Sequence, residues 1–248
     1  MKKVLDFLMS NPITSAVATL ITYAFYGAVI GLCTVPSIYL ITFVNSQIDL
    51  IGIKEYAIFG ITLGLAVYLY FITSILVFGV LERLLILGFK PGRYKTNSLT
   101  FVRWLIYSGL HVILLNTTMP FVAGTFWGQL FYKILGAKIG KNVFINTKGL
   151  HDAYLLTIED NVVIGGDANI SCHTFEGNTL TLGKITIRKN TLVCAEAYIM
   201  PGADIGENCN IGIKSYVRKN RKVEDKSIIM TIPGIPAKKV AQIIKEEK

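Results

Sequence analysis

Formal charges are scarce in this sequence: only 17% of its 248 residues are charged, whereas 52% are hydrophobic. The scarcity is uneven along the chain, because residues 7–48 and 56–81 form uncharged stretches of 42 and 26 residues. About 20 helical residues cross the hydrocarbon core of a bilayer, so each stretch is long enough for a membrane span. A cleaved signal peptide has a shorter apolar core, of about 7–15 residues, so the first stretch is predicted to be retained.

Sequence signatures of several protein classes are also missing. The chain has no glycine-rich phosphate loop and no dinucleotide fingerprint. Its net charge of +9 is not gathered in a basic segment with interleaved aromatics, so no nucleic-acid partner is predicted. The cysteines form no CxxC pair, and we expect reduced, structural thiols that fit a cytosolic soluble part. They are Cys33, Cys172, Cys194 and Cys209.

Basic residues flank the two apolar stretches unequally. The 45–55 loop between them has one lysine against two acidic residues. The flanking regions carry Lys2, Lys3, Arg83, Lys90, Arg93, Lys95 and Arg103. By the positive-inside rule, the amino terminus and everything after residue 81 face the cytoplasm. Residues 1–103 are therefore predicted to form a two-span domain of the cell membrane with a basic cytoplasmic loop.

A third apolar stretch, residues 104–132, contains polar residues and a proline, among them His111, Asn116 and Pro120. A third crossing would also carry the second half of the chain out of the cytoplasm. We therefore expect residues 104–135 to form a helical linker that is broken near Pro120 and lies on, or dips into, the membrane.

After Gly136, aliphatic residues recur every six positions, and small residues follow most of them by four. The aliphatic series is Ile139, Ile145, Ile158, Ile164, Ile170, Ile187, Val193, Ile199, Ile205, Ile211 and Val217. A period of six fits neither an amphipathic helix nor an alternating strand, and is typical of a parallel β-helix. Three hexads make a coil, with the aliphatic side chains on its axis. About four coils fit between Ile139 and Lys222, within a β-helix domain predicted over residues 136–232.

The repeat is interrupted twice. Thirteen residues separate Ile145 from Ile158, and seventeen separate Ile170 from Ile187, where multiples of six are expected. A segment that leaves the coil gives up stacking between coils, so it persists where it is useful or harmlessly solvated. His151 lies at the first interruption and His173 at the second, and the chain has only three histidines.

The repeat region resembles the left-handed β-helix acyltransferases of the hexapeptide-repeat family. The similar phrases are IGKNVF, IGGDAN, IMPGAD, IGENCN and the closing IPGIPAKKV. The resemblance covers about residues 136–240. It implies a fold class of membrane α plus all-β: two transmembrane helices, interfacial helices, a left-handed parallel β-helix and a short helix in the tail, 233–248. It also implies a homotrimer and a thioester donor, either coenzyme A or phosphopantetheine, without a metal.

A narrower resemblance rests on the order of two spans followed by FYKILGAKIG, TIEDNVVIGGDA and HTFE. This order is similar to the carboxy-terminal membrane acyltransfer domains of peptide synthetases of the ε-poly-lysine synthetase type. Those domains come three in a row and join amino acids delivered as carrier thioesters, which implies an acyl or peptidyl carrier protein as a partner. Where they have an acidic residue after a bulky one, this chain has Tyr154, with Asp152 two residues earlier.

The resemblance implies that His173 is the general base and that it lies beside an extruded loop, near a groove between subunits. An imidazole with a pKa near 6.5 is partly neutral at pH 7 and can accept a proton from an amine or hydroxyl. Glu176 is expected to orient this imidazole. From the residues alone, the simpler interpretation is preferred: His173 caps a corner and Glu176 is a solvated loop acid.

His151, Asp152 and Tyr154 are predicted to bind the acceptor, although His151 also fits a simple corner position. The predicted donor site uses a basic cluster after the last hexad, for phosphates or an acidic carrier helix, and small residues against which a pantetheine arm would lie. These residues are Arg218, Lys219 and Lys222, with Ala195 and Gly212. A solvated loop facing anionic lipid is the alternative for the basic cluster.

The predicted function is that of an integral membrane acyltransferase. It would move an acyl or aminoacyl group from a thioester to an amine or hydroxyl at the cytoplasmic membrane face. Alternatives are an O-acetyltransferase of a cell-envelope sugar and a non-catalytic membrane scaffold. A zinc hydratase on the same fold would need all three histidines together. Because His111 lies in the membrane part, we expect this alternative to fail.

Overall fold

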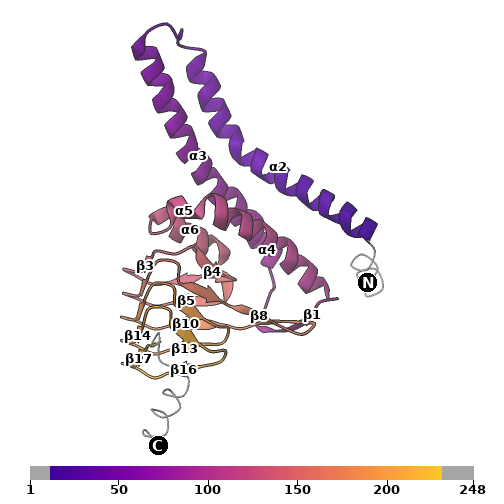
Figure 1. Cartoon of the computed structure of the whole chain (residues 1–248), viewed down its shortest axis with the longest axis vertical. Helices are drawn as coiled ribbons and strands as arrows, with labels where there is room; N and C mark the ends of the chain where they lie inside the picture. Colours follow the sequence, from indigo (N-terminus) through magenta and orange to yellow (C-terminus); the bar gives the residue numbers. More distant parts are fainter. Residues whose placement is uncertain (1–11, 231–248) are drawn as a thin grey trace, which may run out of the picture.

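The computed structural model describes residues 12–230 and has two parts (Figure 1). Two long helices, α2 (Pro12–Asn45) and α3 (Ile53–Ile86), project away from a β-structure formed by the second half of the chain. Each has 34 residues. At 1.5 Å per residue each helix is about 51 Å long, more than the ~30 Å hydrocarbon core of a bilayer.

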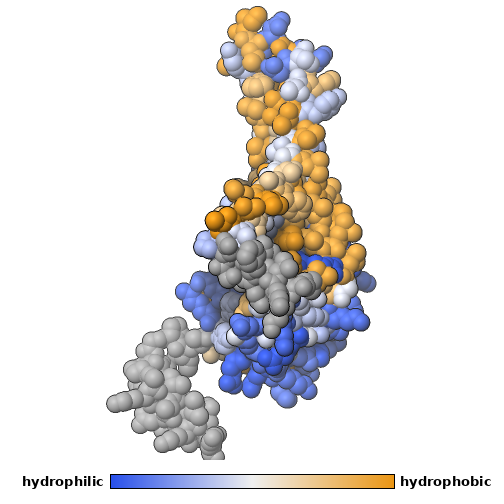
Figure 2. Space-filling view, turned by 90° about the vertical axis from the view of Figure 1, so that its right-hand side faces the viewer, coloured by the Kyte–Doolittle hydropathy of each residue, from blue (hydrophilic) through white to orange (hydrophobic). Residues whose placement is uncertain are grey.

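The surface of this helix pair is apolar, whereas the β-structure is largely hydrophilic outside (Figure 2). Large apolar side chains face outward along both helices, for example Leu20 and Ile61. Between the helices, the Ser37 hydroxyl donates to the carbonyl of Ala66, so this buried polar group is satisfied within the pair. The predicted spans are therefore confirmed as helices with the length and composition to cross a membrane.

Three helices lead from this pair to the β-structure: α4 (Leu99–Thr117), α5 (Met119–Val122) and α6 (Phe126–Leu135). The helical path breaks at Thr118, and Pro120 lies in the first turn of α5, where its missing N–H costs no helical bond. The break near Pro120 is thus where it was predicted. The predicted boundary at residue 104 falls inside α4, because Ser98 caps that helix by accepting from the N–H of Phe101. By length and composition α4 also has the properties of a span.

The β-structure is a parallel β-helix with three faces. The first face contains β2 (Lys138–Ile139), β5 (Leu156–Ile158), β10 (Ile185–Ile187), β13 (Asp204–Ile205) and β16 (Lys222–Val223). The second contains β3 (Phe144–Ile145), β6 (Val163–Ile164), β11 (Leu192–Val193), β14 (Asn210–Ile211) and β17 (Ile228–Ile229). The third contains β4 (Gly149–His151), β7 (Asn169–Ser171), β12 (Tyr198–Ile199) and β15 (Tyr216–Val217).

The predicted fold class, apolar helices followed by a parallel β-helix, is therefore confirmed. Two faces have five strands, so the β-helix is about one coil longer than predicted. The extra strands come from hexads at its carboxy-terminal end, because β17 continues the six-residue spacing past Val217. The predicted helix in 233–248 lies outside the described residues.

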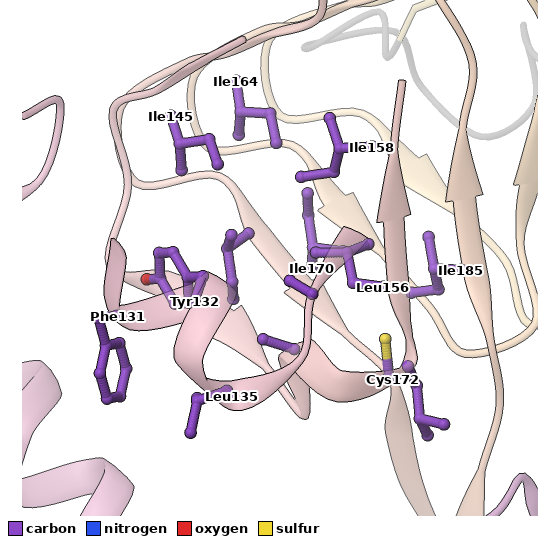
Figure 3. Packing of buried hydrophobic residues seen from close by; sticks show 14 of the residues in the cluster. Phe131, Tyr132, Leu135, Ile145, Leu156, Ile158, Ile164, Ile170, Cys172 and Ile185 are labelled. Atoms are coloured by element: carbon purple, nitrogen blue, oxygen red, sulfur yellow. The ribbon is translucent and has the colours of Figure 1, made fainter. Parts of the chain in front are cut away.

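The hexad residues stack on the axis of the β-helix. Ile158, for example, pairs with Ile139 below it and Ile187 above it, across both interruptions of the repeat. Figure 3 shows part of this core, with Ile145, Ile164 and Ile170 pointing inward. Each of these is at most 2% exposed. The core continues into α6, whose Tyr132 and Leu135 close the end of the β-helix.

Left-handed backbone conformations form many of the corners. At one corner they occur at Asn142, Asn161, Asn190, Asn208 and Lys226, with φ between 52° and 61°. Asparagine tolerates this region better than most residues. The four asparagine side chains also bond to one another from coil to coil, at 3.1–3.2 Å. The corner is thus fixed by backbone preference and by a ladder of amides.

Candidate active site

The second interruption is a β-hairpin, β8 (His173–Glu176) and β9 (Thr179–Leu182). The six-residue spacing fails within this hairpin, so the next axial residue after Ile170 is Ile187, seventeen positions later. The hairpin is joined by β1 (Gly92–Lys95), which follows α3 and pairs antiparallel with β9. The extruded segment predicted at His173 is therefore a three-stranded sheet, tied by β1 to the end of a long apolar helix.

His173 begins this hairpin and pairs with Asp152 from the first interruption. The Nδ1 atom of His173 lies 2.5 Å from Oδ2 of Asp152. Asp152 has a left-handed backbone, with φ of 55°, which turns its side chain toward the hairpin. The His173 side chain is 25% exposed and that of Asp152 is 1% exposed. Among the described residues, Nε2 of His173 has no hydrogen-bond partner, so it is available to a substrate.

Asp152 has two further donors on its other oxygen, Oδ1. The indole N–H of Trp104 donates to it at 2.8 Å, and the Tyr154 hydroxyl at 3.2 Å. Burial by itself raises the pKa of Asp152. The hydrogen bond and charge of His173, with the indole bond, outweigh burial and lower the pKa below its usual value. The carboxyl is therefore an anion at neutral pH, and it holds a proton on Nδ1 of His173.

The structure brings all three histidines together. The ring centroids of His111 and His151 lie 5.9 Å apart, and those of His151 and His173 lie 6.1 Å apart. His111 was expected to lie apart from the other two histidines, but α4, itself long and apolar enough to span a membrane, places it against the first coil. Burial and the neighbouring imidazoles lower the pKa of His151 to about 4. His151 is thus neutral at physiological pH, and its Nε2 lies 3.4 Å from Nδ2 of Asn169.

His111 does not offer a free nitrogen to a metal. Its Nδ1 lies 2.8 Å from Oε2 of Glu82, and its Nε2 lies 3.2 Å from the carbonyl oxygen of Leu150. Within residues 12–230, no group of three His, Cys, Asp or Glu side chains is arranged to hold a metal ion. The cluster therefore gives no support to a zinc hydratase, although its histidines do meet.

Glu176 does not occupy the orienting position predicted for it. Its carboxylate pairs with the ammonium of Lys219, and one oxygen lies 3.7 Å from Arg93 of β1. His173 and Glu176 are the first and last residues of the four-residue strand β8, so their side chains lie at different distances from the coil. Asp152 was predicted to bind the acceptor, but its carboxylate contacts the ring of His173 instead. Tyr154, predicted for the same role, donates to Asp152.

The predicted donor residues are not gathered into one site in this chain. Arg218 lines a hollow of about 200 Å³ near Tyr216, whereas Gly212 lines a separate hollow of about 420 Å³. Ala195 lies beside the second hollow, since its carbonyl accepts from the N–H of Lys214 in that hollow's lining. Lys219 is engaged by Glu176, and Lys222 is exposed on the first face.

Two site residues were not predicted as such, Trp104 and Glu82. Both lie in apolar helices, where their partners are 48 and 29 positions away in the sequence. Glu82 does leave a signal, because it is the first charged residue after 26 uncharged ones. A carboxylate in a long apolar stretch indicates a functional or paired group.

No family model matches the chain. A curated relative, the delta-poly-L-ornithine synthetase of Acinetobacter baumannii (strain AB307-0294), is 29% identical over 198 residues. The match covers 79% of this chain and 14% of the relative, so the chain spans about one seventh of that protein.

Solved structures also resemble the chain, with TM-scores too low to bear on function. A maltose O-acetyltransferase from Clostridium difficile 630 is 17% identical, with a TM-score of 0.43, covering 60% of this chain and 96% of that one. A hexapeptide-repeat acetyltransferase from Vibrio cholerae, complexed with acetyl coenzyme A, is 12% identical, with a TM-score of 0.40, covering 56% and 88%. By its repeat and its fold, the chain is a parallel β-helix that carries apolar helices, and one part of this poly-ornithine synthetase is similar to it in sequence.

Proposed function

We propose that this chain is an integral membrane acyltransferase with His173 as its general base. It transfers an acyl or aminoacyl group from a coenzyme A or carrier-protein thioester to an amine or hydroxyl at the cytoplasmic face of the membrane. The observation that carries the proposal is the 2.5 Å contact between His173 Nδ1 and a buried carboxylate, with Nε2 left for the acceptor.

The proposed reaction needs only one base. Nε2 of His173 takes the proton of the acceptor N–H or O–H while the nitrogen or oxygen attacks the thioester carbonyl carbon. The carbon–sulfur bond then breaks, and the leaving thiolate receives the proton from the imidazolium. Asp152 keeps Nδ1 protonated, which fixes the tautomer, and its negative charge stabilises the imidazolium.

An amine is the favoured acceptor in this proposal. The curated relative is named as a synthetase of poly-L-ornithine, a polymer joined through amide bonds. A domain related to part of this synthetase would form an amide from an aminoacyl thioester and an amino group. Transfer to a hydroxyl, as in sugar O-acetylation, is the competing outcome of the same assay.

The apolar helices support a membrane location. We propose that α2 and α3 cross the bilayer and that α4 lies at its cytoplasmic surface. Two aromatic contacts support this arrangement of α4: Phe101 and Trp104 pack against Phe175 of the hairpin, with ring centroids 6.0 and 5.5 Å apart. Because one face of α4 packs against the hairpin, its other face is left for lipid head groups and acyl chains.

A groove between two copies of the chain is the proposed donor site. His173 is partly exposed, but the hollows that the predicted donor residues line are elsewhere in the single chain. A homotrimer would bring donor residues of one copy, such as Arg218 or Gly212, toward the base of the next. A transfer assay run once with a coenzyme A thioester and once with a carrier-protein thioester decides which of the two is the donor.

The experiment compares His173→Ala with the unaltered protein in detergent or nanodiscs, using aminoacyl thioesters and amine acceptors. We expect transfer to fall by on the order of 10²-fold or more, because the acceptor would lose its base. The oligomeric state should stay unchanged, whereas some thermal stability should be lost, because the buried Asp152 carboxylate would keep only its Trp104 and Tyr154 donors. A variant with undiminished turnover would refute the role of His173.

A further inference from the structure

One face of α4 lies along the segment that carries Asp152. Trp104, Tyr107 and His111 are spaced at i, i+3 and i+7, which places them on one side of a helix. All three are at most 4% exposed. Trp104 bonds to Asp152, Tyr107 packs against the ring of Tyr154 at 6.0 Å, and His111 bonds to the carbonyl of Leu150. Two helical turns, about 10 Å, thus contact residues 150–154 from end to end.

The bond from Trp104 has a specific geometric effect. Asp152 offers one oxygen to His173 and the other to the indole N–H at 2.8 Å. A carboxylate held at both oxygens cannot rotate about its last bond without breaking one of the contacts. The indole ring also meets the imidazole of His173 edge-on, at a centroid distance of 4.9 Å. Trp104 therefore restrains both members of the pair.

The bond from His111 fixes the other end of the segment. A backbone carbonyl can only accept, so Nε2 of His111 carries a proton and donates to Leu150. Nδ1 then faces Glu82 Oε2 with a single proton between them, either on the ring or on the carboxyl. Glu82 is fully buried and lies on α3, so this pair connects a long apolar helix to the strand that leads into Asp152.

We propose that α4 is a positioning element of the candidate active site, with Trp104 and His111 holding Asp152 in the orientation that aligns His173. This inference rests on the proposed function. It makes the apolar helices part of the site, because the orienting carboxylate of a base on the β-helix is set by side chains of α4 and, through Glu82, of α3. Neither residue touches the substrate, so both act through Asp152.

The first experiment uses Trp104→Phe, which keeps an aromatic ring but removes the N–H donor. The matched control is Trp127→Phe, at the other tryptophan of the chain, which packs against Phe126 on α6. We expect Trp104→Phe to lower kcat by about 10-fold with little change in KM for either substrate, because binding contacts are kept. Trp127→Phe should leave both constants unchanged. Equal kinetics for Trp104→Phe and the unaltered enzyme would overturn the proposal.

A second readout does not depend on turnover. The chain has three histidines, so ¹⁵N-histidine labelling yields three imidazole spin systems, and His173→Ala identifies one of them. We expect the Nδ1 proton of His173 to shift in Trp104→Phe and to stay in place in Trp127→Phe. An unshifted His173 signal in a folded Trp104→Phe protein would contradict a positioning role.

The third arm separates the bond at Leu150 from the charge of Glu82. Glu82→Gln can donate an amide N–H to Nδ1 while Nε2–H of His111 still donates to Leu150, so we expect it to lower kcat clearly less than His111→Phe does. His111→Phe keeps the stacked rings but loses the bond to Leu150, and should lower kcat by about 10-fold. If Glu82→Gln were as damaging as His111→Phe, charge rather than position would be the cause, and this part of the proposal would fail.

The arms also distinguish this inference from the proposed function. If His173→Ala is inactive while the Trp104 and His111 variants are fully active, His173 remains the base and only α4 loses its role. If His173→Ala retains full transfer, the base assignment itself is wrong.

Discussion

Asp152 combines three properties that suit an orienting carboxylate: it is buried, it is charged, and its backbone is left-handed. The left-handed conformation, with φ of 55°, is one that Asp and Asn adopt more readily than other side chains. Without this turn the carboxylate would follow the strand direction of β4 and miss the hairpin. Backbone conformation and catalytic geometry therefore depend on the same residue.

Two isosteric amide substitutions test which carboxylate orients His173. Asp152→Asn keeps the left-handed turn but loses the charge, so we expect transfer to fall by on the order of 10²-fold. Glu176→Gln removes only exposed ion pairs with Lys219 and Arg93, so transfer should fall less than about threefold. Initial rates of both purified variants measure this. A larger loss for Glu176→Gln than for Asp152→Asn would restore the original assignment of Glu176.

His151 predicts how stability depends on pH. Its pKa is lowered to about 4 in the folded chain, from an ordinary value near 6.5. The unfolded chain therefore binds this proton more tightly, and the free energy of unfolding falls as the pH drops from about 6.5 to about 4. Above pH 6.5 this residue does not make the free energy of unfolding depend on pH.

The corresponding variant is His151→Gln, which cannot be protonated in this range. We expect it to lose less unfolding free energy than the unaltered protein between pH 7 and pH 4.5, by about 2 kcal/mol. Denaturant unfolding in detergent at the two pH values measures the difference. Identical pH dependence in the two proteins would indicate that the ring of His151 is hydrated rather than buried.

At the scale of elements, the backbone is held differently in the hairpin and in the corners. The hairpin leaves the coil and recovers its lost hydrogen bonds by pairing with β1, so β9 is not an open edge. The corners stay within the coil and are held by left-handed asparagines. The strand that pairs with this extruded hairpin, β1, follows the end of α3.

Asn161 allows the corner to be tested. Asn161→Ala forces an ordinary side chain into a φ of 59°, and we expect the free energy of unfolding to fall by about 1–2 kcal/mol. Asn161→Gly loses the same amide ladder but tolerates the conformation, so it should be less destabilised than the alanine variant. Denaturant unfolding of the two variants gives the comparison. Equal losses would assign the stability to the amide ladder alone.

At the scale of the whole molecule, the second face of the β-helix carries a row of outward apolar side chains. Phe144, Val163, Leu192 and Ile228 are 38–68% exposed and stack in register, interrupted only by Asn210. Contiguous apolar surface of this kind is typical of an interface. In the proposed trimer, this face would meet a neighbouring copy.

Leu192→Lys tests this face. A lysine in the centre of an apolar interface would be buried without a partner, so we expect the oligomer to dissociate and transfer to be lost. Thr186→Lys, on the outward side of the first face, is the matched control and should keep both the oligomer and the transfer activity. Mass photometry in nanodiscs reports the oligomeric state. A Leu192→Lys protein that remains trimeric and active would exclude this face from the assembly.

Much of the fold follows from local spacing in the sequence. The six-residue period predicted the β-helix because each hexad places one aliphatic side chain on a narrow axis, and Ile158 and Ile187 do stack there. The uncharged stretches predicted α2 and α3 because a bilayer needs a fixed length of apolar helix. The break near Pro120 was predictable because proline is tolerated in the first turn of a helix but not in its interior.

The sequence by itself therefore determined the coil, the long helices and the position of His173 at an interruption. Only the tertiary structure decided which carboxylate faces that imidazole, which strand holds its hairpin, and that His111 lies beside the other two histidines. Spacing within one element is encoded locally, whereas contacts such as Trp104 with Asp152 depend on how α4 packs across the β-helix. That packing involves many residues at once and leaves no periodic trace in the sequence.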